Sequence, residues 1–429
     1  MSIRFRGRSR GGGGGGGAAP VTNTIDLDFG AETYSLNGAS ATFADVLTFT
    51  RASDGTRFNS SGVLVTETTD VARFDHDPNT FAALGLLVED QRTNLATYTP
   101  ALTTNWNQSQ STKTNAYAAS IDGTTNATRV VPDAGNTGHR LDGPLTWVNG
   151  TEYCLSVYAK PDGYTNVGIA GFTGAADHAT LFGLSGAGTV IGYRNPNITS
   201  SGIQQLANGW YRVWQVFTST GSGFTAIAIQ LSSWPDAGST NWDAMGAGNT
   251  TSGALFYGVQ IEAGNYPSSF IPAPAGSSVT RSADVCPFTA AGNTALNSAT
   301  RTVIQTGQAF GMVADRRIFG DAGADADGSI FAKTAASIYH DYGAGELNAS
   351  PLSGTMAAYK AGLAFDAGNT ALCLNAGTVA STATGQTSSP TSWSLTSGGT
   401  GVQMPVQRVS TFDCHNYKFT DGQLQTATT

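Results

Sequence analysis

The chain has 429 residues, more than one ordinary core accommodates, so two or three domains are expected. Charged residues make up 12% of the chain, about half the usual share of roughly 25%, and the net charge of −8 excludes general attraction to nucleic acid. Hydrophobic residues reach 40%, Gly occurs 54 times, and no long apolar pattern has a helical period. These features predict an all-β protein with many short loops.

Residues 1–20 are predicted to form a basic arm on a flexible tether. Arginine occupies every second position near the start, at Arg4, Arg6, Arg8 and Arg10. In an extended chain these side chains lie on one side, and the seven consecutive glycines that follow form a flexible linker. We therefore predict that the arm anchors the protein in an acidic groove or sheet edge of another protein. A disordered tail and a contact with nucleic acid are the alternatives.

Neither targeting segments nor metal motifs are evident in the sequence. The residues after Met1 are not apolar, so no signal peptide is predicted, and no apolar run is long enough for a transmembrane helix. The cysteines lack the spacing of zinc sites, and the strand patterns around Cys154 and Cys373 predict that both are buried. No metal or cofactor is predicted. The histidines show neither metal nor nucleophile spacing and are expected in surface or loop positions: His76, His139, His178, His340 and His415.

Residues 21–100 contain short strands separated by turns, which predict a small β domain that docks the chain. A domain of this size is expected to bury itself against another domain or another copy of the chain. Its charged residues could suggest acid–base chemistry, but structural ion pairs at strand ends are the preferred interpretation. The residues concerned are Arg51, Arg73, Arg92, Asp70 and Glu89.

The same region carries a resemblance to known proteins. Several short segments follow one another in a fixed order, at residues 49–53, 62–64, 70–74, 85–89 and 92–95. This order resembles a module common in the head-spike and tail-fibre proteins of bacteriophages. The resemblance implies a docking domain in a virion protein.

Residues 101–285 alternate repeatedly between apolar and polar side chains, the pattern of an antiparallel jelly-roll sandwich. Their segments also resemble, in order, the carbohydrate-binding-module-like domain of phage spikes and fibres, at residues 157–160, 209–212, 256–264, 267–272 and 279–284. The resemblance implies a jelly roll able to bind glycans, although virions also use such domains as spacers.

A glycan site needs an aromatic face for the sugar ring and polar groups for its hydroxyls. One loop between two predicted strands offers both. The predicted carbohydrate-binding residues are Trp234, Asp236, Trp242 and Asp243, with Trp106 and Tyr193 as further candidates. The alternative is that these aromatic residues anchor the loop against the sandwich or form a subunit interface.

Residues 286–429 contain a third set of short strands and are predicted to form a second antiparallel jelly-roll sandwich. Thr420 and Gln423 form a capping box for a short terminal helical turn. The acidic segment from Asp321 to Asp327 suggests calcium, but the bidentate acid of an EF-hand is missing, and an ordinary acidic loop is predicted. The order of segments resembles the laminin-G-like, concanavalin-like lectin sandwich, at residues 361–368, 372–377, 406–409 and 419–424.

The stretch 255–284 joins the two sandwiches as a core strand, a Gly turn and an exit that contains three prolines. Its last residues, 280–284 (TRSAD), echo residues 50–54 (TRASD). The same short exit therefore occurs before and after the central sandwich, and it is predicted to act as a joint.

Together with the resemblances, the sequence predicts a structural, non-enzymatic virion protein of a bacteriophage, a fibre or a spike that its arm anchors to capsid or tail proteins. The resemblances imply a homotrimer and attachment to host-surface glycans, with neither a membrane nor a nucleic-acid partner. Such a protein is made in the host cytoplasm and released by lysis.

Two alternatives stay open at this stage. One is a tailspike depolymerase that cuts host glycans with a pair of acidic residues. Its acids are few and scattered, and the sequence shows no β-helix repeat. The other is a secreted bacterial lectin, which the missing signal peptide opposes.

Overall fold

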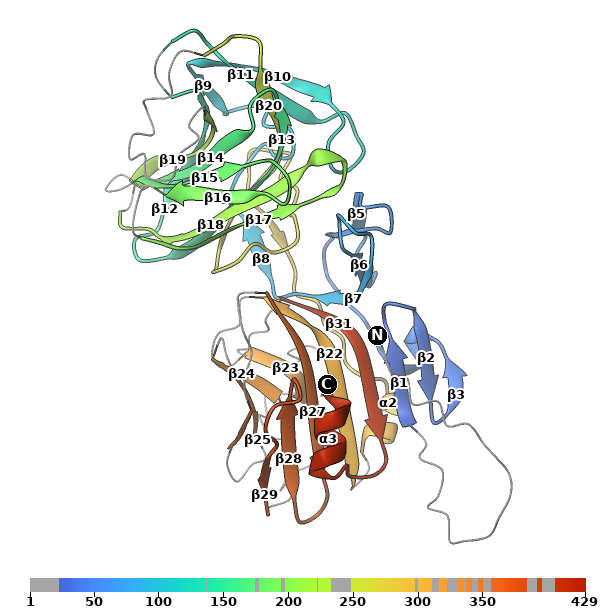
Figure 1. The fold of residues 1–429 in the computed structure, drawn as a ribbon. Coiled ribbons are helices and arrows are strands. Elements are labelled where there is room, and N and C mark those ends of the chain that lie inside the picture. The colour runs from blue at the N-terminus through green and yellow to red at the C-terminus, as the bar shows by residue number, and fades with distance from the viewer. Residues whose placement is uncertain are drawn as a thin grey trace, which may run out of the picture. The chain divides into compact units, whose positions relative to one another are not determined.

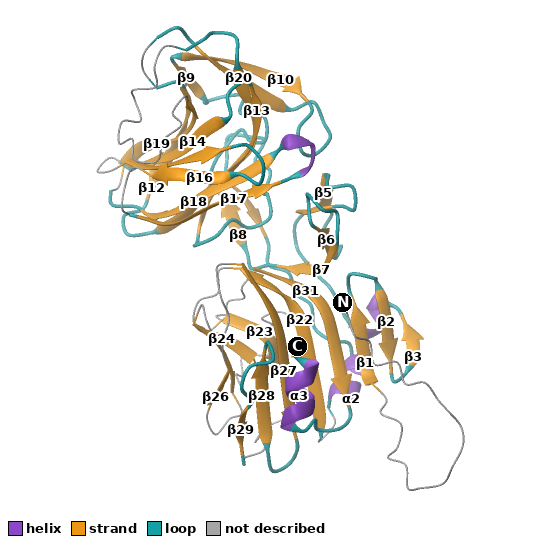
Figure 2. Cartoon of the chain, in the orientation of Figure 1, coloured by secondary structure: helices purple, strands orange, loops and turns teal. Residues whose placement is uncertain are grey.

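Antiparallel strands dominate the structure, a computed structural model, and the all-β prediction is confirmed (Figure 2). Within the described ranges, no helix has the length and apolar character that crossing a bilayer requires. The helical segments are short: α1 (Phe43–Val46), η1 (Ala207–Gly209), α2 (Ala290–Leu296) and α3 (Asp421–Ala427). The structure describes residues 23–135, 138–173, 177–193, 197–221, 223–232, 248–297, 300–310, 316–321, 330–334, 337–341, 346–349, 356–383, 392–395 and 406–429.

The chain forms two compact units and crosses from one to the other four times (Figure 1). Unit 1 contains the residues up to Thr50, the segment Leu84–Val88 and the residues from Asp284 onward. Unit 2 contains Arg51–Ala83 and Glu89–Ala283.

This division differs from the domain boundaries expected from the sequence. Residues 21–100 were expected as a domain of their own, but the two units share them. The physical reason is strand pairing over a long sequence distance, because the first strand pairs with the last one rather than with its near neighbours alone. The expected boundary between residues 285 and 286 lies beside the crossing after Ala283.

Unit 2 is built on an antiparallel jelly roll of two six-stranded sheets, with the orders β10-β11-β20-β13-β18-β17 and β16-β15-β14-β19-β12-β9. The partners are nested: β11 pairs with β20, β12 with β19, β13 with β18 and β14 with β15. Successive pairs alternate between the sheets, which is the jelly-roll arrangement that the sequence predicts. The bounds are β9 (Asn107–Ser109), β10 (Ser111–Ala118), β11 (Ala127–Pro132), β12 (Arg140–Trp147), β13 (Glu152–Asp162), β14 (Asn166–Phe172), β15 (Asp177–Gly183), β16 (Thr189–Tyr193), β17 (Ile198–Gln205), β18 (Tyr211–Thr218), β19 (Gly223–Ser232) and β20 (Gly253–Ala263).

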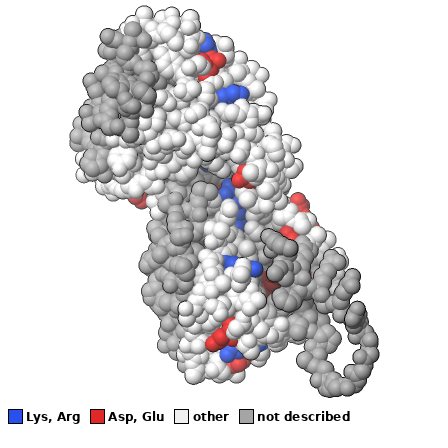
Figure 3. Space-filling view, in the orientation of Figure 1, with Lys and Arg blue, Asp and Glu red and all other residues white. Residues whose placement is uncertain are grey.

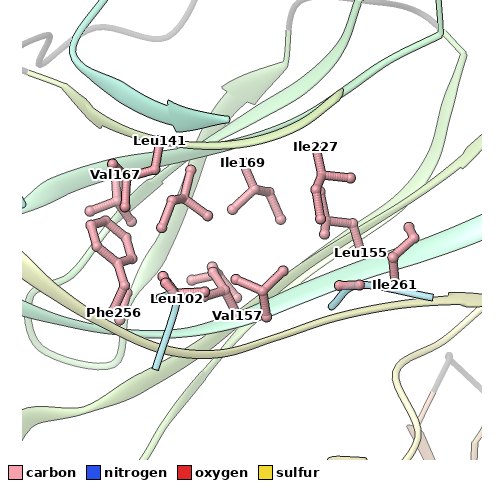
Figure 4. Close-up of a cluster of buried hydrophobic side chains, with 14 of the residues drawn as sticks. Leu102, Leu141, Leu155, Val157, Val167, Ile169, Ile227, Phe256 and Ile261 are labelled. Atoms are coloured by element: carbon pink, nitrogen blue, oxygen red, sulfur yellow. The ribbon is translucent and has the colours of Figure 1, made fainter. Parts of the chain in front are cut away.

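The core of the jelly roll lies between these two sheets. Leu155, Val157 and Ile261 come from one sheet and face Val167 and Ile227 from the other (Figure 4). Each of these side chains is at most 1% exposed. Burying an aliphatic side chain of this size contributes roughly 1.5–3 kcal/mol. The alternating pattern of the sequence therefore reflects a continuous two-sided core.

Residues from earlier in the chain cover the outer face of the sheet that contains β13 and β20. Phe58 and Leu64 pack there with Tyr158, Tyr257 and Phe270. Residues 51–83 thus bury their apolar side chains against a neighbour, as expected, and that neighbour is the jelly roll of the same unit. The short strands of unit 2 are β4 (Gly55–Phe58), β5 (Leu64–Glu67), β6 (Arg73–His76), β8 (Arg92–Asn94) and β21 (Val279–Arg281).

Unit 1 contains two antiparallel sheets. The larger has the order β29-β28-β27-β22-β31-β1-β2-β3, with β7 also paired to β31, and the smaller has the order β26-β25-β24-β23-β30. Phe319 of the smaller sheet lies 5.0 Å, centroid to centroid, from Phe412 of the larger one, so the two sheets pack face to face. The bounds are β1 (Asn23–Asp28), β2 (Thr33–Leu36), β3 (Ala39–Ala41), β7 (Ala83–Val88), β22 (Arg301–Phe310), β23 (Arg316–Asp321), β24 (Ile330–Thr334), β25 (Ser337–Asp341), β26 (Glu346–Ala349), β27 (Met356–Phe365), β28 (Thr370–Leu374), β29 (Ala380–Thr382), β30 (Trp393–Ser394) and β31 (Val406–His415).

The last helix of unit 1 begins as the sequence predicts. The Thr420 hydroxyl accepts a hydrogen bond from the backbone amide of Gln423, and the Gln423 side chain accepts one from the amide of Thr420. This capping box satisfies two amides that the first helical turn would leave without partners.

The two echoed segments lie next to each other at the crossings. Thr50 and Val285 exchange two backbone hydrogen bonds of 2.9 Å, and the amide of Ser282 donates to the hydroxyl of Ser53 at 2.9 Å. The chain changes units directly after Thr50 and directly after Ala283. The repeated sequence therefore marks a paired joint in the chain path.

Charged side chains occupy small, separate spots of the described surface on the face displayed in Figure 3. Both signs occur there, and uncharged residues cover most of the area. On this face the described residues form no extended basic stripe of the kind that nucleic acid would need.

Candidate functional site: a buried carboxylate clasp

The charged residues singled out in the sequence meet in the interior of unit 2. Glu89 and Arg73 are both completely buried, and Arg73 Nη1 lies 2.7 Å from Glu89 Oε2. A second buried guanidinium approaches from the end of the domain, because Arg281 Nη1 lies 3.5 Å from the same oxygen. The expected structural ion pair therefore exists, but it is buried, and it includes an arginine that lies 192 positions further along the chain than its carboxylate.

Ser269 completes the surroundings of this carboxylate. Its amide donates to Glu89 Oε1 at 2.8 Å and its hydroxyl to Oε2 at 2.6 Å. Burial alone would raise the pKa of Glu89, but Arg281 and Arg73 together with the Ser269 hydrogen bonds hold it well below its usual range. The carboxylate is thus ionised at any physiological pH.

A second buried carboxylate holds the neighbouring serine. Glu262 on β20 accepts hydrogen bonds from the Ser268 amide at 2.8 Å and from the Ser268 hydroxyl at 2.7 Å. Gln260 also donates to it at 2.8 Å, and Arg92 Nε lies 4.0 Å from it. We call Glu89, Glu262, Ser268 and Ser269 with their arginines Arg73, Arg92 and Arg281 the serine clasp.

Arg51 orders the adjoining loop through contacts of its side chain and its backbone amide. Its guanidinium donates to the backbone carbonyls of Ser53 at 2.8 Å and of Thr68 at 2.9 Å, while its own amide donates to Asp70 at 2.9 Å. Asp70 adopts a left-handed backbone conformation with φ of 63° at this turn. The hydrogen bond from the Arg51 amide to Asp70 therefore fixes this turn.

Asn94 is a buried residue of this region that the sequence reading did not single out. Its side-chain amide donates to the carbonyls of Ile271 at 2.9 Å and Val259 at 3.2 Å. Its side-chain oxygen accepts from the amides of Ala96 at 3.0 Å and Ile261 at 3.1 Å. The only sequence signal was its place in the segment 92–95, which carries the phage-like order. Asn94 therefore joins the exit segment to the core strand β20.

The geometry of the serine clasp suits a structural role. Both carboxylates lie at 0% exposure and receive hydrogen bonds from protein donors on each side. A general acid or nucleophile needs to reach its substrate, and these groups are enclosed by their own donors. Buried charges of this kind fix the geometry of a fold, because removing one partner leaves the other uncompensated.

The predicted carbohydrate-binding residues lie outside the described residues. This holds for Trp234, Asp236, Trp242 and Asp243, as it does for the arm residues Arg4, Arg6, Arg8 and Arg10 and for positions 322–327 of the acidic segment that begins at Asp321.

The structure does place the two further aromatic candidates. Trp106 is wrong as a glycan contact, because it is 3% exposed, belongs to the jelly-roll core and donates its indole N–H to the carbonyl of Thr97 at 3.0 Å. Tyr193 is 62% exposed at the end of β16 and can contact a ligand. Local sequence does not distinguish these two cases, because covering segments decide which aromatic ring is enclosed.

One exposed aromatic residue was missed in the sequence. The ring of Tyr117 is 50% exposed, and the guanidinium of Arg129 lies 5.0 Å from its centroid. Arg129 also pairs with Asp162 at 2.5 Å and donates to the carbonyl of Thr251 at 2.7 Å. Arg129 therefore covers one side of the Tyr117 ring and leaves the rest of it exposed on unit 2. We call Tyr117, Arg129 and Asp162 the Arg129–Asp162 patch.

The cysteine prediction is confirmed and the histidine prediction is wrong in part. All four cysteines are buried and free, Cys154 and Cys373 included. His178 lies in β15 at 0% exposure with its ring stacked on Phe217, and His139 is 1% exposed. His139 lies in the loop before β12, so the prediction fails for His178, which was expected in a surface or loop position and is enclosed in a strand. Among the described residues no cluster of acidic, histidine or cysteine side chains could hold a metal ion.

No protein-family model matches the chain, and the comparison with curated proteins finds no match. The resemblances to phage spike and fibre modules and to lectin sandwiches therefore enter below as proposals. The jelly roll, the second sandwich and the serine clasp rest on the structure itself.

Proposed function

We propose that the chain is a structural virion protein of a bacteriophage, a fibre or spike whose sandwiches contribute to attachment to host-surface glycans. One observation carries the proposal. The segments that resemble a phage docking module supply Arg73 and Glu89, and the segments that resemble the carbohydrate-binding-module-like domain supply Ser269 and Arg281. The two resemblances thus meet in one buried network, as expected if both belong to a single inherited structural module.

The fold supports the same reading. A jelly roll braced by buried ion pairs and a second antiparallel sandwich make rigid building elements, and rigid elements suit a projecting attachment protein. Within this proposal the basic arm with Arg4, Arg6, Arg8 and Arg10 docks into capsid or tail proteins, three chains associate, and the particle rather than a membrane carries the protein.

The position in the particle tests the proposal directly. Cryo-microscopy and mass spectrometry of intact particles from the phage that encodes the chain should find it in the virion, and deletion of residues 1–17 should remove it while the free protein still folds. Finding the chain only in the infected cell and never in particles would overturn the proposal. Retention of the deleted form in particles would overturn the anchoring role of the arm alone.

Glycan attachment has a separate test. The double substitution Trp234→Ala with Trp242→Ala should abolish binding on an array of host glycans, whereas Val148→Ala, at an exposed apolar position of the jelly roll, should not change it. Tyr193→Ala and Tyr117→Ala provide the comparison with the described exposed aromatic residues. Binding that survives the double substitution but disappears with Tyr117→Ala would move the site to the Arg129–Asp162 patch.

The depolymerase alternative makes a different prediction. Incubation of the purified full chain with host polysaccharide should leave the polymer size unchanged under the proposal. A falling polymer size would establish an enzyme. Sensitivity of that activity to Asp236→Asn or Asp243→Asn would then identify its acidic pair.

A further inference from the structure

The pairing of the first and last strands of unit 1 brings two carboxyl groups face to face. Asp26 on β1 lies directly opposite Asp413 on β31, and the next position on the same face pairs Asp28 with Thr411. Directly opposite residues of an antiparallel pair project on the same side of the sheet. The carboxyl groups of Asp26 and Asp413 therefore stand side by side on one face of the sheet, where two carboxyl groups can hydrogen-bond only if they share a proton.

The other residues on this face offer little compensation. On the far side of β31, Ile304 of β22 stands opposite Asp413, and Thr306 stands opposite Thr411. Lys360 of β27 stands opposite Thr306 and is the cation that acts on Asp413. Asp28 adds a further negative charge, although its Oδ1 accepts a hydrogen bond from the amide of Ala31 at 2.9 Å.

His415 is the remaining titratable group on this face of β31. Its ring packs against those of Tyr417 and Phe419 at 5.8 and 4.7 Å between centroids. Burial lowers its pKa to about 4, so it is neutral above that pH and supplies no positive charge to the acid pair.

The carboxyl pair thus has one charged neighbour of each sign, Asp28 and Lys360, and no surplus of positive charge offsets the repulsion between Asp26 and Asp413. Burial and the neighbouring Asp26 raise the pKa of Asp413 to about 7, while Lys360 acts in the opposite direction. Below that pH the pair holds one proton and forms its hydrogen bond. Above it, two like charges stand directly opposite each other, which destabilises a cross-strand pair.

We propose that a proton shared by Asp26 and Asp413 holds the N-terminal strands β1, β2 and β3 on the sheet of unit 1, so that loss of this proton loosens β1 from β31. The opening exposes the backbone groups of β31 between Thr411 and Cys414, which then form a free sheet edge able to pair with another strand. This property does not depend on the proposed virion function.

Apolar contacts limit how far the strand opens. Ile25 and Leu27 project to the other face of β1 and are both 0% exposed, and Phe29 after the strand is 1% exposed. These side chains keep β1 mostly bound at every pH at which the unit is folded. The proton therefore changes a local opening equilibrium, and the N-terminal strands stay attached most of the time.

Hydrogen exchange of the full chain between pH 5 and 8.5, corrected for the intrinsic exchange rates, measures this opening. In the wild type the opening constant of β1 should rise by up to about tenfold per pH unit and level off above about pH 7, because the open state releases the proton. The amides that pair β22 with β27 should show no such rise. Asp413→Asn should make the β1 profile flat, and Lys360→Met should move its midpoint to higher pH.

Two further variants keep the test decisive. Asp26→Asn removes the other half of the pair at an exposed position, so it serves if Asp413→Asn does not fold. Asp366→Asn is the matched control, because this carboxylate of the same unit caps a turn through the amides of Gly368 and Asn369, and its pKa is lowered. It should leave the β1 profile unchanged. A flat wild-type profile, or a slope that survives in both Asp413→Asn and Asp26→Asn, would overturn the proposal.

Discussion

Glu89 in unit 2 is completely buried and Asp413 in unit 1 is partly buried, and their surroundings shift the pKa values of the two carboxyl groups in opposite directions. Glu89 meets two guanidinium groups and two donors from Ser269, so its charge is stabilised and its pKa falls. Asp413 meets a second carboxyl group across the strand pair, so its neutral form is stabilised and its pKa rises. Burial raises the pKa of both carboxyl groups, so the sign of the neighbouring charge decides whether the pKa ends below or above its usual value.

The comparison shows how one fold uses acids in two ways. A carboxylate among cations fixes geometry permanently, because no accessible pH removes its charge. A carboxyl group opposite another acid responds to pH near neutrality. The first arrangement suits a rigid clasp, and the second suits a contact that opens.

Removal of the clasp carboxylate should have the largest effect. Glu89→Gln removes the buried carboxylate that both Arg73 and Arg281 contact, and we expect unit 2 to lose about 3–5 kcal/mol of unfolding free energy. Denaturant unfolding followed by hydrogen exchange in each unit measures this loss separately for the two units. Unchanged protection of β13 and β20 in the variant would show that the clasp does not stabilise the unit.

Asn94→Ala tests whether neutral hydrogen bonds hold the exit segment as firmly as charge does. The substitution removes the partner of four buried backbone groups, at Val259, Ile271, Ala96 and Ile261. Each unsatisfied buried group costs about 1–3 kcal/mol before relaxation, and we expect a total loss of about 2–4 kcal/mol. Asn79→Ala, at an exposed residue of the same unit, is the control and should stay within about 0.5 kcal/mol. Equal effects of the two substitutions would contradict the role of Asn94.

The two units should respond to pH with opposite signs. The folded pKa of Glu89 lies below its unfolded value of 4.5, so its contribution to unit 2 is present above that pH and is lost as the pH falls below it. The folded pKa of Asp413 lies above its unfolded value of 3.8, so unit 1 loses stability as the pH rises from about 3.8 to about 7. Thermal unfolding resolved by unit between pH 3 and 8 should show both trends. A common pH optimum for the two units would contradict the comparison.

The all-β fold could be predicted because alternation is a local property of each strand. Val157 and Tyr158 are neighbours in sequence and enter different cores on the two faces of β13, which alternation anticipates. The sequence also predicted the charged residues around Glu89 as structural ion pairs.

Contacts between residues that lie far apart in the sequence could not be predicted in the same way. Thr24 donates a hydrogen bond to the carbonyl of Cys414, 390 positions away, and no local pattern contains that pairing. The same limitation placed residues 21–100 in one domain and took Trp106 for a surface aromatic. Which strand covers a face is decided by tertiary packing, so the acid pair at Asp26 and Asp413 becomes visible only once the register is known.

The smallest expected effect belongs to an ion pair that is partly exposed. Arg57 and Glu67 lie across the β4–β5 hairpin with side chains 21% exposed, and their closest atoms are 2.5 Å apart. Water and salt screen such a pair, so a double-mutant cycle of Arg57→Met and Glu67→Gln should give a coupling energy below about 1 kcal/mol. The same cycle with Arg73→Met and Glu89→Gln should give a larger coupling, because that pair has no exposure. A coupling at the hairpin as large as that in the clasp would show that burial does not strengthen the pair between Arg73 and Glu89.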